Sequence, residues 1–540
     1  MARGESRLWS RRLLIKCLLM LLPLLSLGWR ASQGLGTFGF DIHHRFSDPV
    51  RGVLDADDWE LPEKGSVVYY AVMAHRDRAI HGRRLADNHV APLTFSTGNE
   101  TYRLNSLGFL HYANVTVGTP GSWFLVALDT GSDLFWLPCD CSSCVLALRS
   151  SSGQRLSLDI YSPSTSSTSY IVPCNSTLCT AQAQCHSSPG SCPYKVIYLS
   201  NGTSSTGVLV DDVLHLITDD DQTKAVDARI TFGCGQVEAG SFLNGAALNG
   251  LLGLGIRNIS VPSRLAKEGL AANSFSMCFR VDGIGRISFG DKGSINQGET
   301  PFNLQQPHPT YNVTVSQITI GGSTKIIEFT AIFDSGTSFT YLKDPAYTLI
   351  SETFDSLVQD TRLSSDLNLP FEYCYVLSST QTSYTYPTMN LTMKGGDQFS
   401  VNDPTGLAHT EDGSHIYCLT LVKSRDVNII GQNFMTGYHI VFDREKMVLG
   451  WEASDCYKET NSSMLNIPRT RAAAVPPTAI VNPQATSGGG NRTRSLPNAS
   501  NYLLVLNYYT FITLILFSFL ATTWSSFFLL PCSSHSCNIQ

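Results

Sequence analysis

Two short stretches decide the fold: Phe124-Leu125-Val126-Ala127-Leu128-Asp129-Thr130-Gly131-Ser132 and Ala331-Ile332-Phe333-Asp334-Ser335-Gly336-Thr337. In each, an apolar run typical of a buried strand ends at an Asp, and a small hydroxyl residue and Gly follow. A single Asp-Thr/Ser-Gly sequence is usually only a surface turn. Two copies about 200 residues apart, each behind an apolar strand, instead indicate an internal duplication.

The two turns also predict a chemistry. An Asp at the end of a buried strand is a carboxylate on a tight turn, and two such turns can bring the acids together. Two carboxyls that share a site cannot both ionise cheaply, so one pKa rises and the other falls. The pair then holds one proton in acid, which lets one member activate a water while the other protonates a carbonyl. Asp129 and Asp334 are therefore the predicted catalytic residues.

A second repeat supports the duplication. Asn249-Gly250-Leu251-Leu252-Gly253 follows the first Asp, and Asn428-Ile429-Ile430-Gly431 follows the second. An apolar-apolar-Gly sequence lets another backbone approach closely where a side chain would clash. Either copy alone would equally suit a plain buried strand.

The rest of the central region is mostly β in pattern. Short runs rich in β-branched or aromatic residues, separated by Gly, Pro, Asn and Ser, predict strands at 115–117, 124–128, 208–213, 229–232, 286–289, 311–320 and 440–442. The best helix spans Pro345 to Leu357, where Tyr347, Ile350 and Phe354 recur at helical spacing.

These motifs resemble the pepsin-like aspartic proteases over about residues 108–456, through Tyr112 to Pro120, Asp129 to Pro138 and Asp334 to Ser338. The resemblance implies an all-β fold of two lobes related by pseudo-twofold symmetry, with one Asp from each lobe at the floor of a peptide-binding cleft. It implies an aspartic-type endopeptidase that needs no metal or cofactor. The residues it assigns to support the acid pair are Thr130, Gly131, Ser132, Ser335, Gly336 and Thr337, of which Ser132 and Thr337 resemble the hydroxyls that bond the acids from outside.

The same family closes a β-hairpin flap with a Tyr over its substrate, and Tyr198 to Gly207 is similar to that hairpin, with Asn201-Gly202 as its turn. Tyr198 is the flap residue that the resemblance implies, although Leu199 stands where the family usually has Gly. Tyr194 is the second choice, and a buried strand tyrosine is the plain alternative. Trp136 resembles the indole that supports the flap, and a core tryptophan would explain it nearly as well.

Fifteen cysteines favour an oxidising compartment, and twelve of them lie between Cys139 and Cys456. The cluster at Cys139, Cys141 and Cys144 could in principle ligate zinc. Secretion, which the N-terminal signal peptide described below predicts, argues against zinc because secreted cysteines tend to form disulfides. The spacing resembles the cysteine-rich insert of nepenthesin-like plant aspartic proteases. That resemblance implies the pairs Cys139–Cys144, Cys141–Cys234, Cys174–Cys192, Cys179–Cys185, Cys278–Cys456 and Cys374–Cys418.

The N-terminal region predicts a secreted precursor. Arg11 and Arg12 precede an apolar run, so residues 1–28 form a signal peptide. Residues 29–98 contain a basic stretch from His75 to Arg84 with little apolar periodicity, and we interpret them as a prosegment; a solvated surface helix is the alternative. Such a prosegment could lie over the acid pair and release it at low pH. The lobes are expected at 99–300 and 301–457.

The C-terminal region predicts a membrane attachment. Residues 458–501 are rich in Asn, Ser, Thr, Pro and Gly, which indicates a disordered, glycosylated stalk, and 502–540 form an apolar tail. Small residues at Ser487 followed by a polar spacer favour a glycosylphosphatidylinositol anchor there. A membrane span with a palmitoylated Cys532 or Cys537 is the alternative. Sequons occur at Asn99, Asn114, Asn175, Asn201, Asn258, Asn312, Asn390, Asn461, Asn491 and Asn498.

Composition narrows the remaining classes. The net charge is -6, so no broad basic surface exists for nucleic acid. Signatures of serine hydrolases, zinc proteases and phosphate-binding loops are absent from the sequence. We expect a monomer on the outer face of the plasma membrane that takes peptide or protein substrates. The rival is a non-catalytic binding or inhibitor protein on the same fold.

Overall fold

The computed structural model describes residues 36–456, apart from 48–49, 51–61, 82–92, 98–99, 105–107, 150–154, 181–184, 186–189, 199–201, 220–223, 281–282, 305–308, 364–368, 379–383 and 411–412. The chain divides into two compact units, 1–471 and 472–540, and everything below concerns the first. The predicted signal peptide, stalk, apolar tail, anchor residue Ser487 and the sequons at Asn99, Asn201, Asn461, Asn491 and Asn498 lie outside the described residues.

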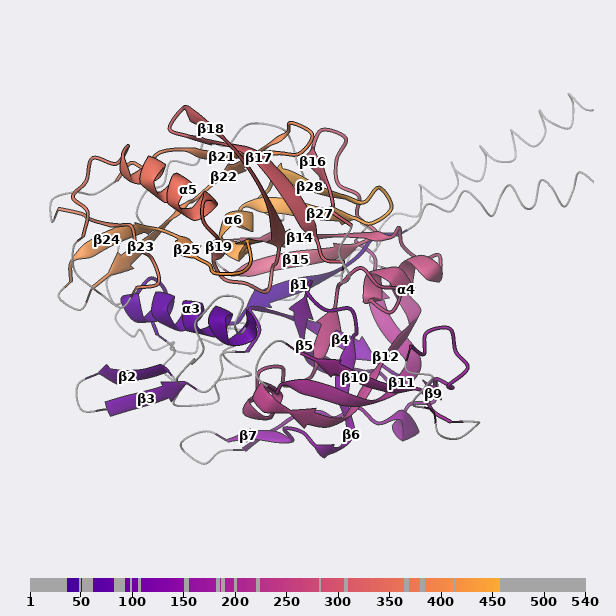
Figure 1. Cartoon of the computed structure of the whole chain (residues 1–540). Helices are drawn as coiled ribbons and strands as arrows, with labels where there is room; N and C mark the ends of the chain where they lie inside the picture. The colour runs from indigo at the N-terminus through magenta and orange to yellow at the C-terminus, as the bar shows by residue number, and fades with distance from the viewer. Residues whose placement is uncertain are drawn as a thin grey trace, which may run out of the picture. The chain divides into compact units, whose positions relative to one another are not determined.

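Two large sheets organise the described residues (Figure 1). The first contains fourteen strands: β1 (Phe38–His44), β4 (His111–Val117), β5 (Ser122–Asp129), β6 (Trp136–Ser143), β9 (Tyr170–Ile171), β10 (Pro193–Ile197), β11 (Ser204–Ile217), β12 (Ala225–Ala239), β13 (Leu251–Gly253), β14 (Ser274–Phe279), β15 (Ile284–Phe289), β16 (Gly298–Pro301), β27 (Tyr438–Asp443) and β28 (Val448–Ala453). The second contains seven: β17 (Asn312–Ile320), β18 (Ser323–Phe333), β19 (Thr340–Leu342), β21 (Met389–Met393), β22 (Gln398–Val401), β25 (Leu421–Lys423) and β26 (Ile429–Ile430).

Smaller elements complete the unit. Three small sheets pair β2 (Leu93–Thr97) with β3 (Glu100–Leu104), β7 (Ala147–Arg149) with β8 (Arg155–Ser157), and β20 (Cys374–Val376) with β24 (His415–Leu419) and β23 (Thr405–His409). The helices within the described ranges are α3 (Val67–His81), α4 (Val261–Lys267), α5 (Ala346–Asp355) and α6 (Gln432–Met435), with 3₁₀ turns η2 (Pro163–Thr165) and η4 (Gly240–Asn244).

The two large sheets repeat one topology, which is the structural form of the sequence duplication. The first runs β12-β6-β13-β5-β4 and the second β25-β19-β26-β18-β17. At each corresponding step the pairing has the same sense: parallel, antiparallel, parallel, antiparallel. The prediction of a β-rich, two-lobed, pseudo-symmetric fold is confirmed.

The repeated apolar-apolar-Gly sequences form the crossing strands β13 and β26. In β13, Gly253 pairs with Asp129, and in β26, Ile430 pairs with Phe333, the residue before Asp334. A Cβ on Gly250 or Gly431 would collide with the backbone carbonyl of Trp136 or Phe339. Glycine is therefore required there so that another backbone can approach closely beside each Asp turn.

The predicted strands and the best predicted helix are present. Each predicted run lies within or overlaps β4, β5, β11, β12, β15, β17 or β27. Helix α5 begins after Pro345 and buries Tyr347, Ile350 and Phe354, as its periodicity indicated. It ends at Asp355, so Leu357 lies beyond it and is 41% exposed.

Aromatic rings join the two large sheets. Tyr311, just before β17, packs against Phe442 of β27 with ring centroids 4.6 Å apart. Phe275 of β14 stacks on the same Phe442 at 4.7 Å. The Tyr311 hydroxyl donates a hydrogen bond to the carbonyl of Leu254 at 2.6 Å. These buried rings belong to one core cluster that contains residues of both large sheets.

The segment interpreted as a prosegment is built into the fold. Strand β1 lies between β4 and β15, antiparallel to both. Helix α3 begins where the Ser66 hydroxyl accepts a hydrogen bond from the Tyr69 N–H, a standard N-cap. Its buried side chains Tyr69, Val72, Met73 and Ala74 pack with residues of the second lobe such as Phe371 and Ile416. The alternative prediction of a solvated surface helix is therefore wrong for α3. One face of this helix is apolar, although the sequence showed little apolar periodicity, and residues of the second lobe bury it.

The structure corrects four of the six implied disulfides. It pairs Cys139–Cys234, Cys141–Cys144, Cys174–Cys185 and Cys179–Cys192, and confirms Cys278–Cys456 and Cys374–Cys418. Strands β6 and β12 run parallel with Leu137 opposite Cys234, which brings Cys139 within 4.9 Å of Cys234 between Cα atoms. Cys141 is then left to its near neighbour Cys144. All twelve cysteines are bridged, so none of them provides a thiolate for zinc.

Burial also separates the described sequons. Asn114, Asn175 and Asn258 are exposed and Asn390 is half-buried. Asn312 is only 4% exposed, and its amide oxygen accepts a hydrogen bond from Asn303 at 2.8 Å. The folded protein therefore offers no access to Asn312, which corrects its prediction as a glycan site. No helix within the described ranges is long and apolar enough to span a membrane.

Candidate active site

The two predicted Asp turns meet. Asp129 is the last residue of β5, and Asp334 directly follows β18. In each turn the Gly N–H donates to the Asp Oδ1 at 2.8 Å, from Gly131 to Asp129 and from Gly336 to Asp334. A Cβ on Gly336 would lie 4.0 Å from Oδ1 of Asp129, so each turn touches the acid of the other.

The hydroxyl residues of the turns lie beside the acids. Thr337 Oγ1 donates to Asp334 Oδ2 at 2.7 Å, and Thr130 Oγ1 lies 3.5 Å from Asp334 Oδ1. Within the described part of the chain, the buried Oγ of Ser132 makes no hydrogen bond of normal geometry, yet its hydroxyl is near enough to Asp129 to favour the charged carboxylate. Ser335 is buried, and its backbone faces His111.

The closeness of the two carboxyls changes the pKa of Asp129. Burial, followed by the charge of Asp334, raises the pKa of Asp129 to about 6. The Ser132 hydroxyl and the Gly131 N–H oppose that rise because they stabilise the charged form. Protonation of Asp129 thus becomes favourable at mildly acid pH.

The hairpin of β10 and β11 brings Tyr198 to the pair. The Trp136 indole N–H donates to the Tyr198 hydroxyl at 2.9 Å. The ring of Phe242 packs edge-on against both, with centroids 4.9 Å from Trp136 and 5.0 Å from Tyr198. Burial and the charge of Asp129 both raise the pKa of Tyr198, which places this phenol near the acid. Phe242 is a site residue that the sequence did not indicate.

Tyr194, the second choice for the flap, has a different environment. It is 7% exposed, its hydroxyl bonds Ser205 at 2.8 Å, and its ring fills the space above Gly233. It therefore stabilises the base of the hairpin, whereas Tyr198 faces the acids.

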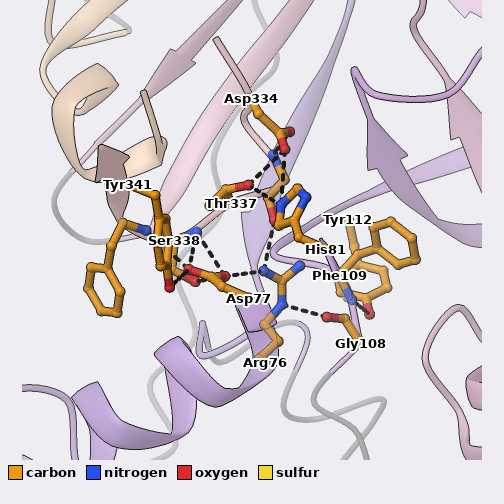
Figure 2. A network of polar contacts seen from close by, with 12 residues as sticks. Arg76, Asp77, His81, Gly108, Phe109, Tyr112, Asp334, Thr337, Ser338 and Tyr341 are labelled. Carbon is orange, nitrogen blue, oxygen red and sulfur yellow. Dashed lines mark hydrogen bonds and ion pairs between the residues drawn. The ribbon is translucent and has the colours of Figure 1, made fainter. Parts of the chain in front are cut away.

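Helix α3 also reaches the acid pair, and Figure 2 shows its side chains there. Arg76 donates from Nη1 to the carbonyl of Gly336 at 2.7 Å and from Nε to the carbonyl of Gly108 at 2.6 Å. Its Nη1 also pairs with Asp77 Oδ1 at 2.8 Å. One guanidinium thus joins α3 to the second catalytic turn and to the start of the first lobe.

Asp77 is the most buried charge of this contact, with no exposed side-chain surface. Its carboxylate accepts from the Ser338 N–H at 3.0 Å and hydroxyl at 2.7 Å, from the Phe339 N–H at 3.3 Å, and from the Tyr341 hydroxyl at 3.1 Å. Several donors and a guanidinium around one carboxylate make a strong buried contact.

At the end of α3, His81 contacts Asp334, one of the two predicted acids. Its Nε2 lies 2.5 Å from Thr337 Oγ1 and 3.4 Å from Asp334 Oδ2 (Figure 2). The imidazole therefore occupies the space directly beside Asp334 and Thr337. Arg76 and His81 lie in the basic stretch that the sequence analysis singled out. Nothing in the sequence indicated a role for Asp77, because the groups that donate hydrogen bonds to it belong to residues 338–341, far along the chain.

The comparisons with known proteins agree with this fold and site. Two family models match, xylanase inhibitor N-terminal at residues 111–291 and xylanase inhibitor C-terminal at residues 310–453. The chain belongs to the plant branch of the pepsin-like aspartic protease family that includes nepenthesin, and its class is that of an aspartic-type endopeptidase.

Individual relatives place the chain more closely. Aspartyl protease family protein 1 of Arabidopsis thaliana is 58% identical, over 93% of this chain and 97% of the relative. Aspartic proteinase nepenthesin-1 of Nepenthes gracilis is 26% identical, over 64% of this chain and 77% of its own. The crystal structure of edgp has a TM-score of 0.50 and 18% identity, over 64% of this chain and 91% of that one, and it supports the fold alone.

Proposed function

We propose that the chain is a secreted aspartic endopeptidase, made as a zymogen and held at the cell surface, which hydrolyses peptide bonds in acid. The observation that carries the proposal is the coupled pair of Asp129 and Asp334, where burial and the second charge raise the pKa of Asp129 to about 6. Both turns retain their Gly donors and hydroxyl neighbours.

The mechanism follows from one proton on two carboxyls. The charged member takes a proton from a water held between the acids, while the protonated member donates to the carbonyl oxygen of the substrate. No covalent bond to the protein forms. General acid-base help of this kind contributes roughly 10² to 10⁴ in rate, and orientation of the peptide beneath Tyr198 adds to it.

In the precursor, residues 29–98 act as an inhibitor. His81 lies 3.4 Å from Asp334, and Arg76 bonds the carbonyl of Gly336 in the catalytic turn. A peptide cannot occupy the same positions, so the segment must leave before catalysis.

Attachment to the outer face of the plasma membrane rests on the sequence of residues 487–540, which favours a lipid anchor near Ser487 over a membrane span. Phosphatidylinositol-specific phospholipase C should release active protein from intact cells, and the released protein should lack the peptide from Tyr502 onward. Recovery of a Cys537-containing peptide from the mature membrane form would decide for the span.

The deciding assay is cleavage of an unfolded protein by the purified, acid-treated chain at pH 3 to 6, with and without pepstatin. Cleavage that pepstatin blocks is expected. A chain that has lost residues 29–98 and still cleaves nothing would support the rival function, a binding or inhibitor protein, in which the dyad is inert.

A further inference from the structure

Two buried histidines face each other where β1 joins the catalytic unit. His44 of β1 and His111 of β4 are directly opposite in the antiparallel pairing, and their ring centroids are 5.2 Å apart. His44 is 7% and His111 4% exposed. We call these two residues the histidine pair. They lie outside the acid dyad, and the proposed mechanism does not use them.

The hydrogen bonds around the pair require neutral rings. His44 Nδ1 accepts from the Phe46 N–H at 3.3 Å, which a protonated Nδ1 cannot do. In the described part of the chain, the buried Nδ1 of His111 has no hydrogen-bond partner, so a proton placed there would have no acceptor. Each histidine also contacts an aromatic ring: Phe46 stacks on His44 with ring centroids 5.8 Å apart, and Phe279 packs at a tilt against His111 at 4.8 Å.

Among the described residues, the neighbouring groups that most affect the pKa of either histidine carry positive charge, or would do so when protonated. Those with the largest effects on His44 are His111, Lys64, Arg76 and Arg45, and the charge acting on His111 is Arg76. Burial is the first cause at both sites. It holds the pKa of His44 well below its ordinary value and lowers that of His111 to about 3, where a backbone contact with Ser335 opposes the shift.

The pair is also connected to α3. Phe46, which His44 both stacks on and bonds, packs edge-on against Tyr69 of α3 at 5.0 Å. The charge of Arg76 in α3 acts on both histidines, and the same guanidinium is bonded to the carbonyls of Gly108 and Gly336. A charge on either histidine would therefore act on both parts of the segment, β1 and α3.

We propose that the histidine pair is the acid sensor that releases residues 36–81: while both rings are neutral the segment stays docked, and when they take up protons it separates. The inference rests on the proposed role of this segment as a prosegment. When the segment leaves, both rings enter water and regain an ordinary pKa of about 6.5. The released form then binds up to two more protons than the docked form, so acid favours release.

One contact works in the opposite direction. A protonated His81 would attract the charged Asp334, 3.4 Å away, and would hold α3 more tightly as the pH falls. That gain is limited because the dyad itself takes up a proton in the same pH range. Among the described residues no carboxylate pairs with His44 or His111, so these two histidines should outweigh the effect of His81, and the experiment must measure His81 separately.

The test measures opening in the intact chain with Asp129→Asn, so no self-cleavage occurs and no protease activity is needed. Hydrogen exchange, corrected for intrinsic rates, gives the protection of β1 and α3 from pH 7 to pH 4, with β21 as internal reference. Each proton bound on opening changes the protection up to about tenfold per pH unit. The expected loss below pH 6.5 is therefore up to about 100-fold per unit for two histidines.

Variants show which histidines bind the protons that the chain takes up when the segment opens. His111→Phe keeps the aromatic packing and should reduce the slope to about tenfold per pH unit, and adding His44→Asn, whose Oδ1 can accept from Phe46, should remove it. His43→Asn is the matched control on the same strand and should keep the full slope, and His81→Gln should not flatten it. If the double variant does not fold, the single variant decides. A flat profile in the parent chain, or an unchanged slope in His111→Phe, would overturn the sensor whether or not the mature chain is a protease.

Discussion

The carboxylate of Asp77 accepts a hydrogen bond from the hydroxyl of Ser338 at 2.7 Å, although the two residues are 261 positions apart in the chain. Ser338 directly follows Thr337, whose hydroxyl donates a hydrogen bond to Asp334 of the proposed dyad. The docked segment therefore holds the backbone of the catalytic turn itself, and not only the space above it.

Asp77→Asn should weaken docking of α3. The amide has a donor where four protein donors already point, and Arg76 loses its ion-pair partner. Breaking such a buried set costs about 3 kcal/mol, or roughly 100-fold in the docking equilibrium. The lag before a test peptide is cleaved, after transfer of the full chain to pH 6, should shorten accordingly. Asp41→Asn, which alters an exposed ion pair with Arg286, is the control and should leave the lag unchanged.

Asp129→Asn and Asp334→Asn should each reduce cleavage to below a few per cent while secretion and thermal stability stay close to the parent chain. An amide cannot exchange the proton that the pair shares. The matched control is Asp140→Asn, an exposed position at φ 39° where Asn is well tolerated. Substantial activity in either dyad variant would rule out the two-carboxyl mechanism.

The pH profile should be confined to acid. Because the pKa of Asp129 is raised to about 6, the proton that the general acid needs is present below that value and is lost as the pH rises through it. The same sign applies to folding: the stability that comes from this group is complete below its ordinary value of 3.8 and is lost as the pH rises through about 6. Measurements of kcat/KM from pH 3 to 8 should show the alkaline limb, and an optimum above pH 7.5 would contradict the assignment.

Tyr198→Phe should lower kcat/KM about tenfold with little change in Tm. The variant leaves the Trp136 indole N–H without its acceptor and removes a hydroxyl from above the acids, a loss of about 1 to 2 kcal/mol. Tyr194→Phe provides the comparison, since it loses only the bond to Ser205. That variant should lower Tm more than kcat/KM; equal effects in both variants would mean that Tyr198 has no special role.

Mass spectrometry of peptides under non-reducing conditions should find Cys139 linked to Cys234 and Cys179 linked to Cys192, with no free thiol among the twelve cysteines. The parallel pairing of β6 and β12 brings the first two together. Recovery of Cys139 linked to Cys144 would require a different register between these strands.

The sequence predicted the catalytic turns well because each is a local pattern: an apolar strand, an Asp and a small turn. The duplication then implied the second lobe. The sequence alone could not predict which cysteines form disulfides. Cys139 and Cys234 are 95 positions apart and become neighbours only because their two strands pair. It also missed Asp77 and Phe242, whose importance comes entirely from contacts made by the folded chain.

The place of β1 has a consequence for how the molecule is assembled and matured. Because β1 lies between β4 and β15, it is an interior strand, and its departure exposes two rows of backbone N–H and C=O groups at once. If residues 36–81 leave as proposed, the main sheet therefore loses an interior strand and gains two unpaired edges, at β4 and at β15. Unless another strand then pairs with β4 and β15, the fourteen-stranded sheet would be divided at this position, so loss of the segment would alter the main sheet as well as the exposure of the acids.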